Sequence, residues 1–193
     1  MIKRVQIESY KSFKSLDLKL SPLTVIFGPN ASGKSNFLDA ISLISRVVTE
    51  KNLKEAFKNH RGYPLESFYY GDEGYENNLK KEKLHLTFEV DVEISAAVQN
   101  RIEEIIRAKR KGIDSQDSAK KVITEPFLRY RVTIEALTET GYLRIDEESL
   151  RAIRKNGQEK SRKAFLEKKE GRLHLRAEGP AHPVYYNIGL DHA

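Results

Sequence analysis

Cysteine is absent from this chain of 193 residues, so disulfide bonds and thiolate metal sites are excluded. The first residues, MIKRVQIESY, lack the apolar segment of a signal peptide. No apolar run in the chain approaches the length of a membrane span. These absences predict a cytoplasmic protein that does not cross a membrane.

The remaining composition fits one domain, or one domain and a fragment. Hydrophobic residues make up 39% of the chain and charged residues 32%, which is enough apolar material for a core. The formal net charge is +6, a mild excess that permits nucleic-acid contact without requiring it. A well-solvated surface is the simpler interpretation of that excess.

The first 48 residues predict three strands, a glycine loop and a helix. Apolar alternation predicts strands at 2–10 and 15–20, and the continuous run Leu23–Phe27 suits a strand buried on both faces. Loop-forming residues follow at 28–33. From Lys34 onward, apolar residues recur at helical spacing.

The rest of the chain predicts mainly strands. Clean alternation marks strands at 84–94 and 128–136, and a turn after the second leads to a short strand at 142–145. The other predictions are weaker. They are a mostly loop region at 49–82, a charged helix at 96–111 and a linker at 112–121. A basic loop or solvated helix follows at 151–169, and a last strand at 173–177.

One motif carries recognisable chemistry. It is the P-loop pattern G-x-x-x-x-G-K-[ST], filled by Gly28, Pro29, Asn30, Ala31, Ser32, Gly33, Lys34 and Ser35. The glycines let backbone N–H groups wrap closely around phosphate oxygens. Lys34 reaches the β- and γ-phosphates, the Ser35 hydroxyl is placed to ligate Mg²⁺, and the following helix points its positive end at the anion. The pattern therefore predicts a site for ATP with Mg²⁺.

The opening of the chain resembles the SMC/RecF-like branch of the ABC ATPases. The resemblance rests on I-x-S-Y-K-S-F at residues 7–13 and on GPNASGKSN, in which Asn36 follows the P-loop serine. It looks most like prokaryotic predicted ATPases and the ATPase parts of OLD-family nucleases. The resemblance is specific over about the first 45 residues and architectural beyond them.

The resemblance implies an α/β P-loop fold of ABC type, with a mixed sheet beside an antiparallel β lobe. We expect the strands, P-loop and helix at 1–48, the lobe at 83–179 and a charged insertion at about 96–121. The family's nucleotide contacts would include Asn36 and Lys11, whose position in the family can approach the nucleotide. The alternative for Lys11 is a solvated lysine in the turn. ATP-driven dimer closure would gate a partner or a DNA-directed or defence activity.

Several motifs of a working ABC ATPase are missing, so we assign no catalytic residue. No signature sequence, Q-loop glutamine or switch histidine is evident. The one Asp-Glu pair after apolar residues, Asp146-Glu147, follows a strand interrupted by Arg144, which favours a structural role over Walker B. The simplest interpretation is an N-terminal part of a larger ATPase. Its partner would be the missing C-terminal half or a second subunit, and the complete protein would be a homodimer.

Two other functions stay open. The chain could be a non-catalytic module that senses nucleotide through its P-loop while it docks a partner. A small-molecule kinase also uses a P-loop, although the long antiparallel strands argue against it. The five histidines are scattered without metal-binding spacing, so a histidine metal site is not expected.

Overall fold

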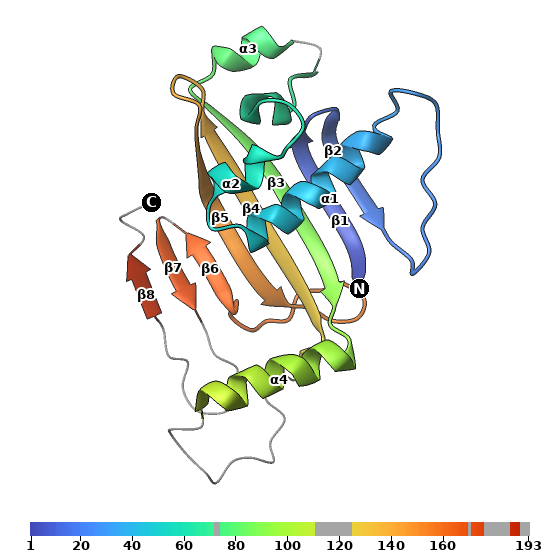
Figure 1. Ribbon diagram of the computed structural model, residues 1–193, viewed down its shortest axis with the longest axis vertical. Coiled ribbons are helices and arrows are strands. Elements are labelled where there is room, and N and C mark those ends of the chain that lie inside the picture. The colour runs from blue at the N-terminus through green and yellow to red at the C-terminus, as the bar shows by residue number, and fades with distance from the viewer. Residues whose placement is uncertain (72–73, 111–124, 170, 176–185, 190–193) are drawn as a thin grey trace.

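Eight strands form one continuous sheet in the computed structural model, which describes residues 1–71, 74–110, 125–169, 171–175 and 186–189 (Figure 1). The order across the sheet is β2-β1-β3-β4-β5-β6-β7-β8, and every one of these neighbouring pairs is antiparallel. The strands are β1 Ile2–Tyr10, β2 Phe13–Lys19, β3 Lys83–Glu93, β4 Phe127–Leu137, β5 Tyr142–Ala152, β6 Leu166–Lys169, β7 Arg172–Leu175 and β8 Tyr186–Gly189.

The helices cover one face of this sheet, and α3 and α4 lie at opposite ends of its long strands (Figure 1). Figure 1 shows α1 crossing in front of the long strands, with α2 beside it, while α4 extends from the end where β3 stops. The helical elements are α1 Lys34–Thr49, α2 Leu53–Lys58, the 3-10 turn η1 Pro64–Ser67, α3 Tyr75–Leu79 and α4 Ala96–Arg110.

The core lies between α1 and the sheet. Alternate residues of β3 and β4 point toward the helix, among them Phe88 and Ile134, and neither is exposed. They meet Phe37 and Leu43 from the apolar stripe of α1. Burying one such side chain fully contributes about 1.5–3 kcal/mol, so this contact holds α1 on the sheet.

The other face of the central strands is polar and is neutralised by ion pairs. Asp91 is almost fully buried there and accepts two hydrogen bonds from Arg129, at 2.7 and 2.8 Å. Glu89 accepts a hydrogen bond of 2.6 Å from Arg4. Removing one partner of such a buried pair costs about 3–5 kcal/mol, because the remaining charge is left without a counter-charge.

The predicted buried strand at Leu23–Phe27 is wrong for this structure. The segment has no regular secondary structure and pairs with no described strand, and Leu23, Val25 and Phe27 are 82%, 73% and 89% exposed. A strand buried on both faces needs hydrogen-bonded neighbours and covering layers, and the described residues supply neither.

The expected mixed sheet is not seen among the described residues, and the division of the chain into parts 1–48 and 83–179 stays a prediction. All described pairing is antiparallel, and β1 lies between β2 and β3. The strands of 1–48 thus belong to the same sheet as those of 83–179. Within 151–169 the prediction of a helix is wrong, because the segment holds the end of β5, a turn and β6. The predicted linker at 112–121 lies outside the described residues.

Candidate functional site: the P-loop and its supports

The P-loop runs from Gly28 to the first turn of α1. Three of its residues have positive φ: Gly28 at 153°, Ala31 at 64° and Gly33 at 90°. The left-handed region costs a non-glycine residue about 1–2 kcal/mol, so Ala31 holds local strain. This winding reverses the chain and leads it directly into the helix.

Gly33 is required by its neighbours as well as by its φ. A Cβ at this position would lie 2.9 Å from Cε1 of Phe13, at the start of β2. The β1–β2 turn is therefore packed directly against the P-loop. A second link joins the two elements, because the Asn36 side chain donates a 2.8 Å hydrogen bond to Oγ of Ser12.

The N-terminus of α1 is open to an anion. Gly33 caps the helix without a side-chain hydrogen bond, and the first turn contains no acidic residue. The backbone N–H groups there keep their partial positive charge, which favours phosphate. Ser35 is exposed in this first turn, with its hydroxyl group free to approach a ligand on the solvent side.

Lys34 folds back onto its own loop. Its Nζ donates to the carbonyl oxygens of Gly28 and Pro29, at 2.7 and 2.6 Å, and lies 3.4 Å from Oγ of Ser32. The ammonium therefore stays within the loop that would surround the phosphates. A bound triphosphate would compete for it with charged oxygens, which accept stronger hydrogen bonds than carbonyls.

Lys11 lies beside the P-loop helix but is already engaged. Its side chain is 13% exposed, and its Nζ contacts Oδ2 of Asp39 at 2.9 Å and the carbonyl oxygen of Arg61 at 3.1 Å. Its backbone has positive φ, at 44°. A nucleotide contact by Lys11 would require the ammonium to leave Asp39.

A buried histidine supports the same region. His60 is 8% exposed and its ring lies 3.1 Å from the Tyr10 hydroxyl and 3.2 Å from Nη2 of Arg46. Burial, together with the nearby positive charges of Lys11 and Arg46, lowers the pKa of His60 to about 4. The folded protein thus holds His60 neutral. Its contribution to stability is complete above its unfolded pKa of about 6.5 and is lost as the pH falls toward 4.

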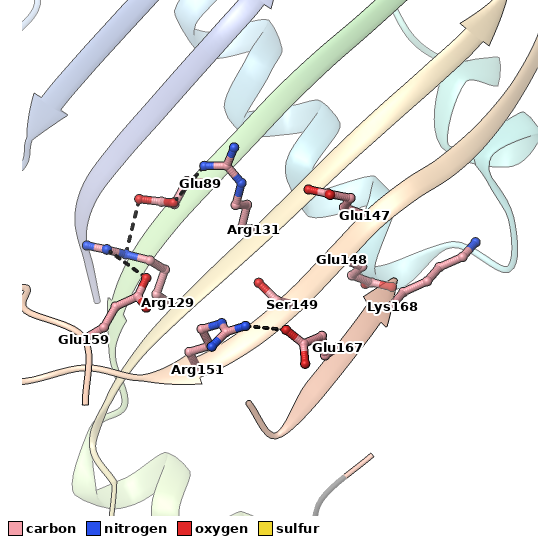
Figure 2. Close-up of a pocket in the computed structure, with 10 residues that line it drawn as sticks. All are labelled: Glu89, Arg129, Arg131, Glu147, Glu148, Ser149, Arg151, Glu159, Glu167 and Lys168. Carbon is pink, nitrogen blue, oxygen red and sulfur yellow. Dashed lines mark hydrogen bonds and ion pairs between the residues drawn. The ribbon is translucent and has the colours of Figure 1, made fainter. Parts of the chain in front are cut away.

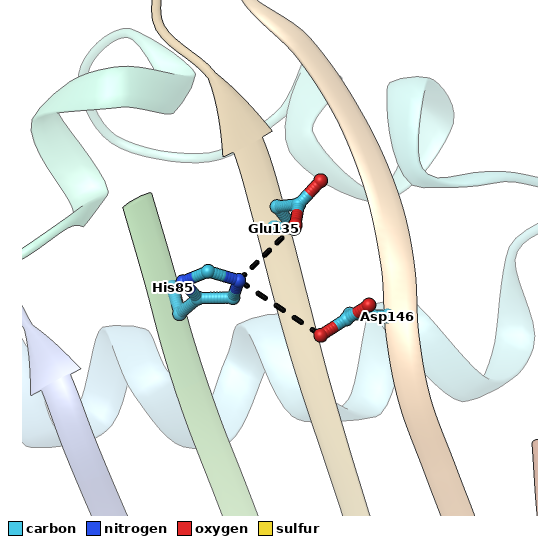
Figure 3. A group of neighbouring side chains, drawn as sticks. All are labelled: His85, Glu135 and Asp146. Atoms are coloured by element: carbon cyan, nitrogen blue, oxygen red, sulfur yellow. Dashed lines mark hydrogen bonds and ion pairs between the residues drawn. The ribbon is translucent and has the colours of Figure 1, made fainter. Parts of the chain in front are cut away.

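The pair Asp146-Glu147 has a place in the structure that fits the predicted structural role. Both residues lie inside the antiparallel strand β5 rather than at the end of a parallel strand. Asp146 faces His85 on the side of the sheet away from α1, at 3.8 Å (Figure 3).

His85, Glu135 and Asp146 bring three potential metal ligands within 4.8 Å of one another, a grouping that sequence spacing did not reveal. Glu135 is nearly buried, and Arg144 and Lys83 contact it at 2.7 and 3.4 Å. Burial alone would raise the pKa of Glu135, but these two cations outweigh it and lower the pKa. The cluster is therefore already neutralised by protein cations.

The strands also form a charged hollow of about 410 Å³ on the face away from α1 (Figure 2). Four cations and five glutamates line it, and several of them pair with one another. The balance of charge makes this hollow an ion-paired surface with no preference for one sign of ligand.

Comparisons with known proteins are consistent with a nucleotide-binding loop in the N-terminal part of the chain. A family model described as an AAA ATPase domain matches residues 1–174. The OLD nuclease of Thermus scotoductus is 46% identical over 44 residues, which cover 23% of this chain and 8% of that protein. The chromosome partition protein Smc of Methanocaldococcus jannaschii is 39% identical over 54 residues, covering 28% and 5%.

A third relative is the DNA replication and repair protein RecF of Streptococcus uberis. It is 37% identical over 65 residues, which cover 31% of this chain and 18% of that protein. The chain thus spans less than a fifth of each of these relatives. No helix among the described residues has both the length and the apolar character needed to cross a membrane. By the match over residues 1–174 and by these relatives, the chain belongs to the AAA ATPase domain family, within its SMC/RecF-like branch.

Proposed function

We propose that this chain is the ATP-binding part of an SMC/RecF-like ATPase of ABC type that works in the cytoplasm. The observation that carries the proposal is the loop at Gly28–Ser35. Three of its residues have positive φ, and it leads into a helix N-terminus that has no side-chain cap. The loop amides would hold the phosphates, Lys34 would contact the β- and γ-phosphates, and Ser35 would ligate Mg²⁺.

We also propose that a further polypeptide segment or subunit completes the site. Leu23, Val25 and Phe27 are exposed just before the P-loop, and α1 also exposes Leu38 and Val48 on its outer side. Apolar surface on both the segment and the helix favours burial against an additional layer. This segment or subunit would supply strands beside Leu23–Phe27 and the carboxylate that activates water. It would be the remainder of a longer chain or a second subunit.

In the complete protein, ATP would draw two such units together and so gate a partner or a DNA-directed activity. Hydrolysis would belong to that assembly, because Asp146 faces away from α1 (Figure 3) and Glu147 lines the charged hollow on the same face (Figure 2). We retain Lys11 as a nucleotide contact of the closed state, reached when its ammonium leaves Asp39. Asn36, bonded to Ser12, would transmit nucleotide binding to the β1–β2 turn.

Calorimetric titration with Mg-ATP tests the nucleotide site. The wild-type chain should bind, Lys34→Ala should lose binding, and Ser35→Ala should lose mainly the Mg²⁺-dependent part. Lys51→Ala, an exposed lysine beyond α1, is the matched control and should bind like the wild type. Equal binding by Lys34→Ala and Lys51→Ala would contradict the assignment. Binding with no hydrolysis in the complete protein would favour the nucleotide-sensing alternative.

A further inference from the structure

A hollow of about 490 Å³ opens at the end of the sheet away from the P-loop. It lies where β1 and β4 begin, where β2 and β3 end, and beside the turn that follows β5. One carboxylate, Asp91, reaches it, against six cations: Lys3, Arg4, Lys19, Arg129, Arg154 and Lys155. We call this hollow the basic pocket.

The strand register gathers three of these cations. Arg4 pairs with Lys19 on one side and with Asp91 on the other, and Asp91 pairs with Arg129. Lys19, Arg4 and Arg129 therefore lie in one row across four strands, on the face away from α1. Lys19 lies directly opposite Arg4, and like charges in this position destabilise a sheet, so the stability of the fold does not explain the presence of Lys19. Asp91 accepts two hydrogen bonds from Arg129 and lies 4.0 Å from Nη1 of Arg4, but it forms no ion pair with Lys19, Arg154 or Lys155.

A fixed turn supplies two more cations. The N–H of Gly157 donates to the carbonyl oxygen of Arg154 at 2.8 Å, and Gly157 adopts a φ of 86° that suits glycine. Arg129 ties the turn to the sheet through a 3.1 Å hydrogen bond to the carbonyl oxygen of Gly157. Arg154 and Lys155 are thereby held exposed at the rim of the pocket.

Lys19, Arg154 and Lys155 are the cations of the pocket most available to a ligand. Their side chains make no hydrogen bond or ion pair within the part of the chain that the structure describes. The other three cations are partly neutralised, Lys3 by Glu93 and Arg4 by Asp17 outside the pocket, and Arg129 by Asp91. An anion entering the pocket would meet three cations that have no hydrogen-bond or ion-pair partner among the described residues, although Asp17 and Glu93 lie near enough to Lys19 and Lys155 to interact electrostatically.

The walls of the pocket are partly apolar. Leu20, Val92, Phe127 and Ile153 line it together with the cations. A ligand that suits both kinds of surface carries phosphates and also exposes flat, weakly polar groups. Single-stranded nucleic acid has this combination, because its bases are free to contact an aromatic ring such as Phe127. A duplex presents its phosphates but keeps its bases stacked inside.

We propose that the basic pocket binds single-stranded nucleic acid, with phosphates on Lys19, Arg154 and Lys155 and a base or sugar against Phe127. The charged hollow of Figure 2 has no such role, because its glutamates outnumber its cations. The proposal does not depend on the P-loop, which lies at the other end of β1, beside Ser12 and Phe13.

Fluorescence anisotropy with a labelled oligothymidylate tests the proposal on the whole chain, from about 50 to 200 mM salt. The triple variant Lys19→Glu, Arg154→Glu, Lys155→Glu should bind at least about ten-fold more weakly at low salt. Its log–log salt slope should be smaller by about 2, since each single-strand phosphate contact contributes about 0.7. Circular dichroism should show the variant folded, because none of the three side chains supports the core.

The matched control reverses three exposed lysines at and near α2, in Lys51→Glu, Lys54→Glu, Lys58→Glu. It changes the net charge equally and should shift binding less than two-fold, with an unchanged slope. Lys34→Ala should bind the oligonucleotide normally, which separates this site from the nucleotide site. The proposal is overturned if both triple variants weaken binding equally, or if the duplex with oligoadenylate binds as tightly as the single strand.

Discussion

Substituting serine for Phe27 should leave the stability of this chain almost unchanged, despite the apolar run in which it lies. The ring is 89% exposed, so little apolar contact is lost, and we expect a change within about 0.5 kcal/mol. Phe88 is the internal standard, since it is fully buried in β3 and forms an edge-to-face contact with Tyr10. Phe88→Ala should cost about 3–5 kcal/mol.

Urea denaturation followed by circular dichroism measures both changes. The two variants should share the slope of the wild type, and only Phe88→Ala should lower the midpoint. In a complete protein that covers residues 23–27, Phe27→Ser should instead become costly, by about 2 kcal/mol or more. If Phe27→Ser destabilised the isolated chain as much as Phe88→Ala, the segment would already be buried and no completing layer would be needed.

Three further predictions concern the supports of the P-loop. Gly33→Ala should cost about 1–3 kcal/mol and weaken Mg-ATP binding, because φ is 90° and Phe13 occupies the space of the new methyl group; a denaturation curve and a titration measure the two effects. Between pH 6.5 and 4 the wild type should lose up to about 3 kcal/mol at His60, a loss that His60→Phe should not show in melts across that range. Lys11→Met should lower the melting temperature measurably, since it leaves Asp39 without its cation, and Asp39→Asn in the same background should recover part of the loss; no recovery would mean that the pair adds nothing.

The long strands and the P-loop could be predicted from sequence because their signals are local. In β3 and β4 the apolar residues alternate along the strand, and the observed bounds differ from the predicted ones by one residue at each end. The pattern at 28–35 likewise predicts its own turn and the start of α1 at Lys34, and the structure contains both. Neither prediction required knowledge of which distant segments meet.

Leu23–Phe27 shows the limit of such reasoning. Four of its five residues are apolar, which favours a buried strand, yet burial depends on partners elsewhere, and the described residues contain none. The apolar pattern indicates that burial would stabilise the segment, whereas the neighbouring elements decide whether it is buried. The same holds for β5, whose charged stretch beyond Ile145 gives no strand signal but pairs with β4 and β6.

The supports of the site and the basic pocket were also beyond sequence reasoning. Lys11 meets Asp39, and His60 meets Tyr10, across 28 and 50 residues of chain. The cations of the basic pocket come from three strands and a turn, and only the register places them together. No spacing in the sequence encodes these contacts, because tertiary packing creates them.

Hydrogen exchange with and without Mg-ATP tests the central proposal most directly, since it reports on individual stretches of backbone amides. The account predicts protection concentrated at Gly28–Ser35 and the first turn of α1, with none in Lys34→Ala. The amides of β3 and β4 should exchange equally in both states. Absence of protection in the loop, or protection that persists in Lys34→Ala, would contradict a triphosphate site at this P-loop.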